Sequence, residues 1–375
     1  MRILINISNH LVGGGLQVAE SFLKECVKFP TNEYHVVYRS SLKEKLGIDK
    51  ISAESFIFHE LPDLKLHQLS DALSKLEKEI NPEVVFSVFG PTYWHSKAPQ
   101  IMGYAIPHYI YPESPYWKIL AWKERLKLRL KEKIHLYFIK RDATSVICET
   151  TDASTRISNK LKSPKKKYFT VSNTFGQQFL NNPKTPFSGK LPEKTSADFW
   201  LLTISSFYPH KNLSVIPAVL DSLKNKGIQN INFILTIPQE DYERIIPERY
   251  RRNVHTLGFV NMEECPDLYE KSDAVFLPTL LECFSANYPE AMISQRPLLT
   301  SDLSFARSVC EDAALYFNPL NPEDIAKKIQ MVLTNPELRK KLVTAGSKRV
   351  LEFPNAEERA RRYLEICKEI IEDNK

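Results

Sequence analysis

The fold is decided by the stretch Leu280-Leu-Glu-Cys-Phe-Ser-Ala-Asn-Tyr-Pro-Glu-Ala-Met292. A strand-like run, Asp273-Ala-Val-Phe-Leu-Pro278, precedes it, and a helical run opens near Ser285 and closes before Pro297. Ser285 suits the N-cap, and Pro289 falls in the first helical turn, where a missing N–H costs little. A strand, a short loop and a helix in this order place a ligand at the carboxyl end of a parallel sheet.

This stretch carries two carboxylates, Glu282 and Glu290, in different settings. Glu282 lies in the loop before the helix, where it can reach a reacting group. Glu290 lies on the helix and can accept two hydrogen bonds from the vicinal hydroxyls of a ribose or hexose. The helix start offers free amide donors and the positive end of its dipole to an anion such as a diphosphate. The alternative, from spacing alone, is two surface glutamates on an amphipathic helix.

The first half of the chain alternates strand-like and helical runs, which indicates a parallel α/β sheet. Its opening strand, Arg2–Ile7, leads into the glycine loop Asn9–Gln17 and a helix from about Val18. Gly14 and Gly15 allow the backbone to approach a ligand closely. A plain turn is an equal alternative, because the G-x-G-x-x-G dinucleotide spacing is absent.

A candidate ligand contact, His108, follows the predicted strand Gln100–Tyr104 in an aromatic loop. The end of a parallel strand is a favourable place for such a contact. The alternative is a histidine with a purely structural role.

The run Tyr116–Arg141 combines Lys, Arg, Trp, Tyr and Leu at helical spacing, with its cations densest over Lys118–Lys133. A basic, aromatic amphipathic helix can lie on an anionic membrane face. A solvated helix face is the alternative for any such run.

A predicted linker, about residues 180–198, separates the two halves, because Asn, Pro, Lys, Ser, Gly and Thr cluster there without periodicity. A second α/β unit then begins with the strand Phe199–Ser205 and the loop Ser206–Asn212. Lys211 stands where a turn after a strand brings an ammonium beside a phosphate. The alternative is an ordinary surface lysine.

The length of 375 residues and the composition limit the number of domains, the kinds of partner and the location of the protein. We expect two domains, residues 1–185 and 186–354, with a last helix at about 355–375 that packs back on the first domain. The net charge of +6 permits contact with phosphate or anionic lipid but does not demand nucleic acid. The six cysteines show no metal-ligand or redox spacing. No signal-peptide pattern and no membrane-length apolar run is evident, so we expect a cytoplasmic protein.

The motifs of the second half are Leu201-Leu-Thr-Ile-Ser-Ser-Phe-Tyr-Pro-His-Lys-Asn-Leu213, Leu257-Gly-Phe-Val260, Leu268-Tyr-Glu-Lys-Ser-Asp-Ala-Val-Phe-Leu-Pro-Thr279, Ala313-Ala-Leu-Tyr-Phe-Asn-Pro319 and Pro322-Glu-Asp324. With the pair Glu282 and Glu290, they resemble glycosyltransferase family 4, the retaining GT-B enzymes, over roughly residues 199–372. The resemblance implies an α/β fold of two Rossmann-like domains that face each other across a cleft. The first half matches more loosely, through the glycine loop and His108.

The resemblance implies a role for each matching position of the second domain. Glu290 would bind the ribose of the donor nucleotide, Glu282 would hold hydroxyls of the donor sugar, and Lys211 would neutralise the diphosphate. Further donor contacts are implied for Phe284, Ser285 and Ala286 at the sugar or diphosphate, and for Gly258, Phe259 and Val260 near the base. Ser205 and Ser206 are also expected to bind the donor.

In the first domain the resemblance implies that Gly14 and Gly15 face the reaction centre and that His108 contacts the transferred sugar. Such enzymes need no metal and no cofactor besides the nucleotide-diphosphate sugar that serves as substrate. The catalytic set is therefore Glu282, His108 and Lys211.

The chain departs from the family pattern at two places. Ser205 and Ser206 stand where the family often has Gly-Arg, so a cation that usually accompanies Lys211 is missing, and Arg307 is a candidate to replace it. The residues after Glu282 are Cys-Phe-Ser rather than the more usual Gly-Phe-Gly.

These features predict a retaining glycosyltransferase that moves a hexose to a glycan or lipid-linked saccharide, in O-antigen or capsule synthesis. Two alternatives stay open: a nucleotide-sugar epimerase of the same fold, and a non-catalytic module that binds a polyanion or a membrane.

Overall fold

The computed structural model describes residues 1–9, 13–51 and 53–375, so part of the predicted glycine loop lies outside the described residues. The chain forms two compact units. The first consists of Met1–Pro112, Leu120–Asn173 and Pro354–Lys375, and the second of Glu113–Ile119 and Thr174–Phe353. The sequence placed the boundary near residue 185, but residues 174–185 group with the second unit.

The first unit is built on a seven-stranded sheet of order β3-β2-β1-β4-β5-β6-β7, in which all neighbouring strands are parallel. Its strands are β1 Arg2–Asn6, β2 Glu33–Arg39, β3 Phe56–Leu61, β4 Val84–Ser87, β5 Gln100–Tyr104, β6 Ser145–Cys148 and β7 Lys167–Thr170. The central strands are apolar on both faces, as expected for a parallel sheet that helices cover on both sides.

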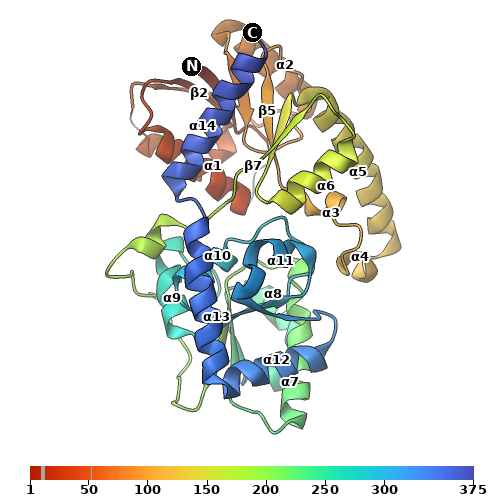
Figure 1. Ribbon diagram of the computed structural model, residues 1–375, viewed down its shortest axis with the longest axis vertical. Helices are drawn as coiled ribbons and strands as arrows, with labels where there is room; N and C mark the ends of the chain where they lie inside the picture. Colours follow the sequence, from red (N-terminus) through yellow and green to blue (C-terminus); the bar gives the residue numbers. More distant parts are fainter. Residues whose placement is uncertain (10–12, 52) are drawn as a thin grey trace. The chain divides into compact units, whose positions relative to one another are not determined.

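Helices cover the two faces of this sheet (Figure 1). They are α1 Gly14–Cys26, α2 Leu66–Ile80, α3 Pro107–Ile110, α5 Trp122–Asp142, α6 Thr151–Leu161 and α14 Ala356–Asp373. Alternate residues of β1 point to opposite faces, so Ile3 and Ile5 join a core with α1 and α14, while Leu4 joins one with α2.

The last helix, α14, completes the core of the first unit. Its N-cap Asn355 and Glu358 form a capping box, which fixes where the helix begins. Tyr363 packs edge-on against Phe22 of α1 at 5.4 Å. The buried guanidinium of Arg359 donates to Ser21 at 2.8 Å. The final residues therefore belong physically to the N-terminal sheet (Figure 1).

The second unit has a six-stranded parallel sheet of order β10-β9-β8-β11-β12-β13. Its strands are β8 Phe199–Thr203, β9 Ile231–Leu235, β10 Val254–Thr256, β11 Ala274–Leu277, β12 Leu298–Ser301 and β13 Ala314–Phe317. The direction in which strands are added reverses beside β8, because β9 lies on one side of it and β11 on the other. Such a reversal opens a crevice at the carboxyl ends of the two strands.

The helices of the second unit are α4 Tyr116–Ile119, α7 Ile216–Asn225, α8 Gln239–Ile245, α9 Cys265–Lys271, α10 Asn287–Ile293, α11 Ser304–Cys310, α12 Pro322–Thr334 and α13 Pro336–Arg349. The N-cap Asn321 accepts hydrogen bonds from two amides of α12, and the N-cap Asn335 accepts one from an amide of α13. No helix among the described residues combines the length and apolarity needed to cross a bilayer.

Candidate active site

The predicted donor-binding residues of the second unit collect at the carboxyl edge of its sheet. Loops that carry them follow β8, β10 and β11, and Glu290 lies on α10 directly after the β11 loop. Because β8 and β11 are neighbours and parallel, their loops emerge side by side at the topological reversal. The residues of one loop can therefore contact those of the other.

Lys211 and Glu282 form an ion pair between these two loops, and both side chains are largely buried. The backbone holds the loops together, because His210 O accepts from Leu280 N at 2.7 Å and from Thr279 Oγ1 at 3.2 Å. The pair thus joins the predicted diphosphate-binding cation to the predicted sugar-binding carboxylate.

Glu290 is held by two side-chain donors on one of its oxygens. Tyr269 Oη donates to Glu290 Oε2 at 2.8 Å, and Asn287 Nδ2 donates to the same oxygen at 3.1 Å. Burial raises the pKa of Glu290, and the hydrogen bonds from Tyr269 and Asn287 oppose that rise. Within the described residues no side chain donates to Oε1, so that oxygen is available to hydroxyl groups of a ligand.

The start of α10 differs from the sequence prediction. The helix begins at Asn287 and its N-cap is Ala286, whereas Ser285 makes no capping hydrogen bond. Ser285 instead forms part of a preceding turn, in which its carbonyl accepts from Tyr288 N at 3.1 Å. Ser285 and Phe284 are buried, and the Phe284 ring packs against Phe353 at 6.2 Å. The prediction of Ser285 as the N-cap is therefore wrong.

Ser205 and Ser206 lie in the loop that follows β8. Ser205 N donates to Thr236 Oγ1 at 2.9 Å, which ties this loop to the one after β9. Arg307, the candidate to replace the missing cation, is engaged in a bidentate pair with Asp302 at 2.5 and 2.9 Å. Arg244, which the sequence did not single out, lies over the ring of Phe207 at 4.9 Å, beside Ser206.

The loop after β10 contains Gly258, Phe259 and Val260. Gly258 has a φ of 70°, a conformation that favours glycine, and its amide donates to Thr256 Oγ1 at 3.3 Å. Val260 is buried, whereas Phe259 is 90% exposed. An exposed aromatic ring at this edge offers a flat apolar face to a planar ligand.

Gly14, Gly15 and His108 belong to the first unit. The two glycines form the first turn of α1, so the helix starts earlier than the predicted Val18. Gly13 is its N-cap with a φ of 54°, and a Cβ atom at Gly14 would meet nothing within 4 Å. His108 lies in the short helix α3, and burial lowers the pKa of its imidazole. That imidazole is therefore neutral near pH 7.

Two contacts of the site were missed from the sequence. The first is Tyr269, a fully buried residue whose hydroxyl holds Glu290. The second is Ser114, whose Oγ donates to Leu280 O at 2.6 Å, while Tyr116 packs edge-on against His210. Tyr269 could have been found from the sequence, because it stands in the motif Leu268–Thr279. Ser114 could not, because no local pattern shows that the segment Glu113–Ile119 joins the second unit.

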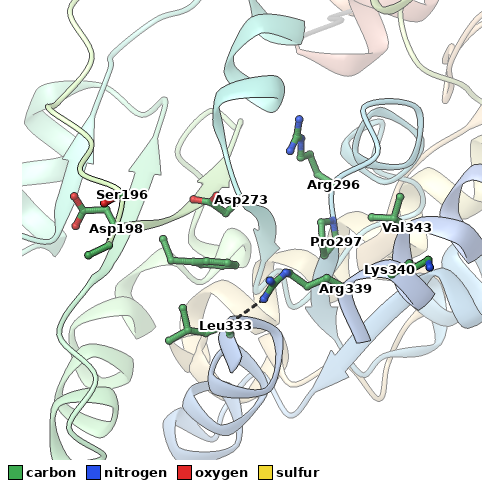
Figure 2. Close-up of a pocket in the computed structure, with 11 residues that line it drawn as sticks. Ser196, Asp198, Asp273, Arg296, Pro297, Leu333, Arg339, Lys340 and Val343 are labelled. Carbon is green, nitrogen blue, oxygen red and sulfur yellow. Dashed lines mark hydrogen bonds between the residues drawn. The ribbon is translucent and has the colours of Figure 1, made fainter. Parts of the chain in front are cut away.

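A separate pocket of the second unit lies at the opposite edge of the sheet (Figure 2). It is lined by residues at the amino ends of β8, β11 and β12, among them Asp198, Asp273 and Arg296. Arg339 lines it too, and its guanidinium donates to Leu333 O at 2.8 Å. This pocket is therefore distinct from the predicted donor site.

Among the described residues no group of three or more His, Cys, Asp or Glu side chains is arranged to hold a metal ion.

Comparison with known proteins places this site in a family context. Residues 188–349 match the family model of glycosyl transferases group 1. The O-antigen chain mannosyltransferase RfbU of Salmonella typhimurium is 28% identical over 152 residues, which make up 39% of this chain and 40% of that protein. The match therefore spans less than half the length of this curated relative.

Solved structures match over nearly the whole chain. A glycosyltransferase from Rickettsia africae has a TM-score of 0.71 at 15% identity, with 99% of this chain and 98% of that chain covered. Anabaena Alr3699/HepE in complex with UDP-glucose has a TM-score of 0.70 at 15% identity, with 98% and 100% covered. The fold is thus GT-B, with two Rossmann-like domains. Residues 188–349, which match the family model, lie in the second of these domains.

Proposed function

We propose that the protein is a retaining glycosyltransferase that moves a hexose from a nucleotide-diphosphate sugar to a glycan or lipid-linked saccharide acceptor in surface polysaccharide synthesis. The observation that carries the proposal is the Lys211–Glu282 pair at the strand reversal, with Glu290 on the helix α10 that follows the Glu282 loop. The match of residues 188–349 to the group 1 family model supports it, as does the likeness of 152 residues of the chain to an O-antigen mannosyltransferase.

Glu290 is proposed to bind the donor ribose. Tyr269 and Asn287 occupy Oε2 and orient the carboxylate, while Oε1 accepts a hydroxyl of the ligand. Charged acceptors form stronger hydrogen bonds than neutral ones, so the ionised form of Glu290 is the binding form. Phe259 is proposed to lie against the base.

Lys211 and Glu282 are proposed to act on the reacting bonds. Lys211 neutralises charge as the bond between the anomeric carbon and the diphosphate breaks, an electrostatic contribution of the kind that dominates such reactions. Glu282 holds the hydroxyls of the sugar. The acceptor oxygen forms the new bond on the face that the diphosphate leaves, and a donor phosphate oxygen takes the acceptor proton. Configuration is thereby retained without a protein base.

From the first domain, His108, Gly14 and Gly15 are proposed to contact the transferred sugar and diphosphate. We propose that the protein works in the cytoplasm, with no metal and no cofactor besides the donor.

Thermal shift against UDP-, GDP-, ADP- and dTDP-sugars tests donor binding, with Glu290→Ala as the control. A donor at a hundred times its Kd stabilises the protein by about 2.7 kcal/mol. The proposal expects a shift with one nucleotide class that the variant loses. Equal shifts in both proteins would contradict the role of Glu290.

Incubation with donor alone then separates transfer from epimerisation, because only an epimerase converts the donor sugar without an acceptor.

A further inference from the structure

The pocket at the amino edge of the second sheet has the size of a small-molecule site (Figure 2). Its volume is about 460 Å³, and sites for small ligands typically measure about 300–1,000 Å³. Residues at the amino ends of β8, β11 and β12 form one part of its wall, and residues of α12 and α13 form the other. The apolar side chains of the wall are Phe199, Pro297, Leu333 and Val343.

Three cations and two acids line this pocket, so positive charge is in excess. The cations are Arg296, Arg339 and Lys340, and the acids are Asp198 and Asp273. Figure 2 shows the two acids to the left of the three cations. A ligand with a negative group at one end and uncharged polar groups at the other end matches this arrangement.

The two acids are already engaged with donors of the protein itself. Asp198 Oδ2 accepts from Thr195 N at 2.8 Å and from Thr195 Oγ1 at 2.7 Å. Asp273 Oδ2 accepts from Trp200 N at 2.7 Å and pairs with Lys194 at 2.7 Å. The acids are therefore poorly placed to hold a ligand cation such as the ammonium of an amino acid. Asp273 Oδ1 accepts no hydrogen bond from the described residues, so it can accept one from a hydroxyl group.

The three cations keep donors that a ligand can use. Arg339 donates from Nη1 to Val332 O at 2.6 Å and to Leu333 O at 2.8 Å, while its Nε and Nη2 make no hydrogen bond within the described residues. In the same part of the chain, neither Arg296 nor Lys340 pairs with an acid. The Nε of Arg296 is buried without a partner, so the protein does not compensate the charge of this guanidinium.

We propose that this pocket is a binding site for a small sugar phosphate. The phosphate binds on the cationic side, because guanidinium groups match phosphate oxygens in pairs of hydrogen bonds. A hydroxyl of the sugar donates to Asp273 Oδ1. A nucleotide fits less well, because Phe199 is only 8% exposed and offers no open face on which a base can stack. This site goes beyond the proposed function and does not rest on it.

Isothermal titration calorimetry of the full chain tests the site, with mannose 6-phosphate as the probe. Mannose and inorganic phosphate are the comparison ligands. We expect mannose 6-phosphate to bind, inorganic phosphate to bind more weakly, and mannose to give no signal. No binding of mannose 6-phosphate overturns the proposal. Equal affinities for mannose 6-phosphate and inorganic phosphate overturn the assignment to a sugar phosphate.

Substitutions on the cationic side test where the probe binds. Lys340→Gln should weaken its binding by about tenfold, since a hydrogen bond to a charged group is lost, and the fold is kept because this side chain is exposed. The matched control is Lys341→Gln, an exposed neighbour on α13 that is not among the described residues of the pocket wall. Arg296→Gln/Lys340→Gln should weaken binding further, whereas its control Arg252→Gln/Lys341→Gln should bind normally. Parent-like affinity of Arg296→Gln/Lys340→Gln overturns the proposal.

A variant of the donor site separates the two sites. Lys211→Gln, which changes the proposed diphosphate-binding cation, should bind mannose 6-phosphate as the parent protein does. The Arg296→Gln/Lys340→Gln variant should keep the thermal shift with the nucleotide sugar. Loss of the probe in the Lys211 variant, with binding kept in the other, overturns the proposal in favour of the donor site. Probe binding by a parent protein that binds no nucleotide sugar contradicts the proposed function and leaves the sugar phosphate site standing.

Discussion

Glu290 illustrates a conflict between stability and binding at a single residue. Its carboxylate is withdrawn from water and its pKa is raised, so the folded protein binds a proton at this group more tightly than the unfolded chain does. The contribution of Glu290 to stability is therefore fully present below the unfolded pKa and is lost as pH rises through the folded pKa. Above its folded pKa the ionised group opposes folding.

Glu290→Gln should therefore leave the free energy of unfolding at pH 7 unchanged or increase it, because the buried charge is removed. Donor affinity should fall by about 1.5–3 kcal/mol, since a hydrogen bond to a charged group is lost. Chemical denaturation and donor titration measure the two effects. A variant that is less stable at pH 7 and still binds donor normally would contradict both statements.

Tyr269→Phe tests how the hydrogen bond from Tyr269 affects the carboxylate of Glu290. The change keeps the buried ring but removes the donor that lowers the pKa of Glu290, so this pKa should rise further. The ionised form is then lost at a higher pH as the solution is acidified, and donor affinity should decline from a higher pH than in the parent. Donor titration over a range of pH measures the shift. Asn287→Ala serves as a comparison, because it removes the longer of the two hydrogen bonds.

At the scale of elements, the segment Glu113–Ile119 is an arm that supports the β11 loop. Ser114 is buried and binds the carbonyl of Leu280, two residues before Glu282. Ser114 is thus a positioning residue that acts through Leu280, and it has no proposed contact with the ligand.

Ser114→Ala should lower kcat by about fivefold, because the loss of one buried hydrogen bond of roughly 1 kcal/mol loosens the loop that carries Glu282. The affinity for the donor should change little, because Glu290, the residue proposed to bind the ribose, lies on a separate element, α10. Ser114→Thr, which keeps the hydroxyl, should restore most of the rate. A loss of donor affinity equal to the loss of rate would argue for a merely structural role. Steady-state kinetics and donor titration provide the comparison.

Most strands could be predicted from the sequence because runs such as Ile3–Ile7 and Ala274–Leu277 are short, apolar and followed by turns. β12 Leu298–Ser301 was not assigned, because only its first two residues are apolar, and β13 Ala314–Phe317 was not assigned, because its two middle residues are only half-buried and give no clear pattern. The start of α10 was misplaced for a different reason: Ser285 uses its backbone carbonyl in a turn, a choice that residue preference does not reveal.

At the scale of the whole molecule, the alternation of strands and helices predicted the fold class, and the GT-B likeness confirms it. The grouping of residues into units was harder to predict from the sequence. The surface against which a segment packs depends on contacts between residues that are far apart in the sequence. Ser114 and Leu280 are an example, since their side chain and carbonyl meet across 166 positions. The role assigned to each site residue stays a prediction.

Removal of Pro354–Lys375 should unfold the first unit and spare the second. The deletion strips α14 from a core that contains Phe22 and Phe86, whose rings pack on Tyr363. Burial of one large aromatic or aliphatic side chain contributes about 1.5–3 kcal/mol, and α14 carries several, so the loss exceeds the margin of an ordinary domain. Calorimetry should show two transitions in the full chain and one in the truncated chain. Two intact transitions after truncation would contradict this account.

Because the end of the chain returns to the first unit, it also limits where segments can be exchanged between this protein and a related one. A crossover that exchanges residues 174–353 is flanked on both sides by the parent's own first unit, so the host core survives the exchange. A crossover that replaces everything after residue 173 supplies a foreign α14 to that core. The proposed donor-binding residues of the second unit can thus be exchanged together as one internal segment, provided that the incoming loop still offers a carbonyl to Ser114.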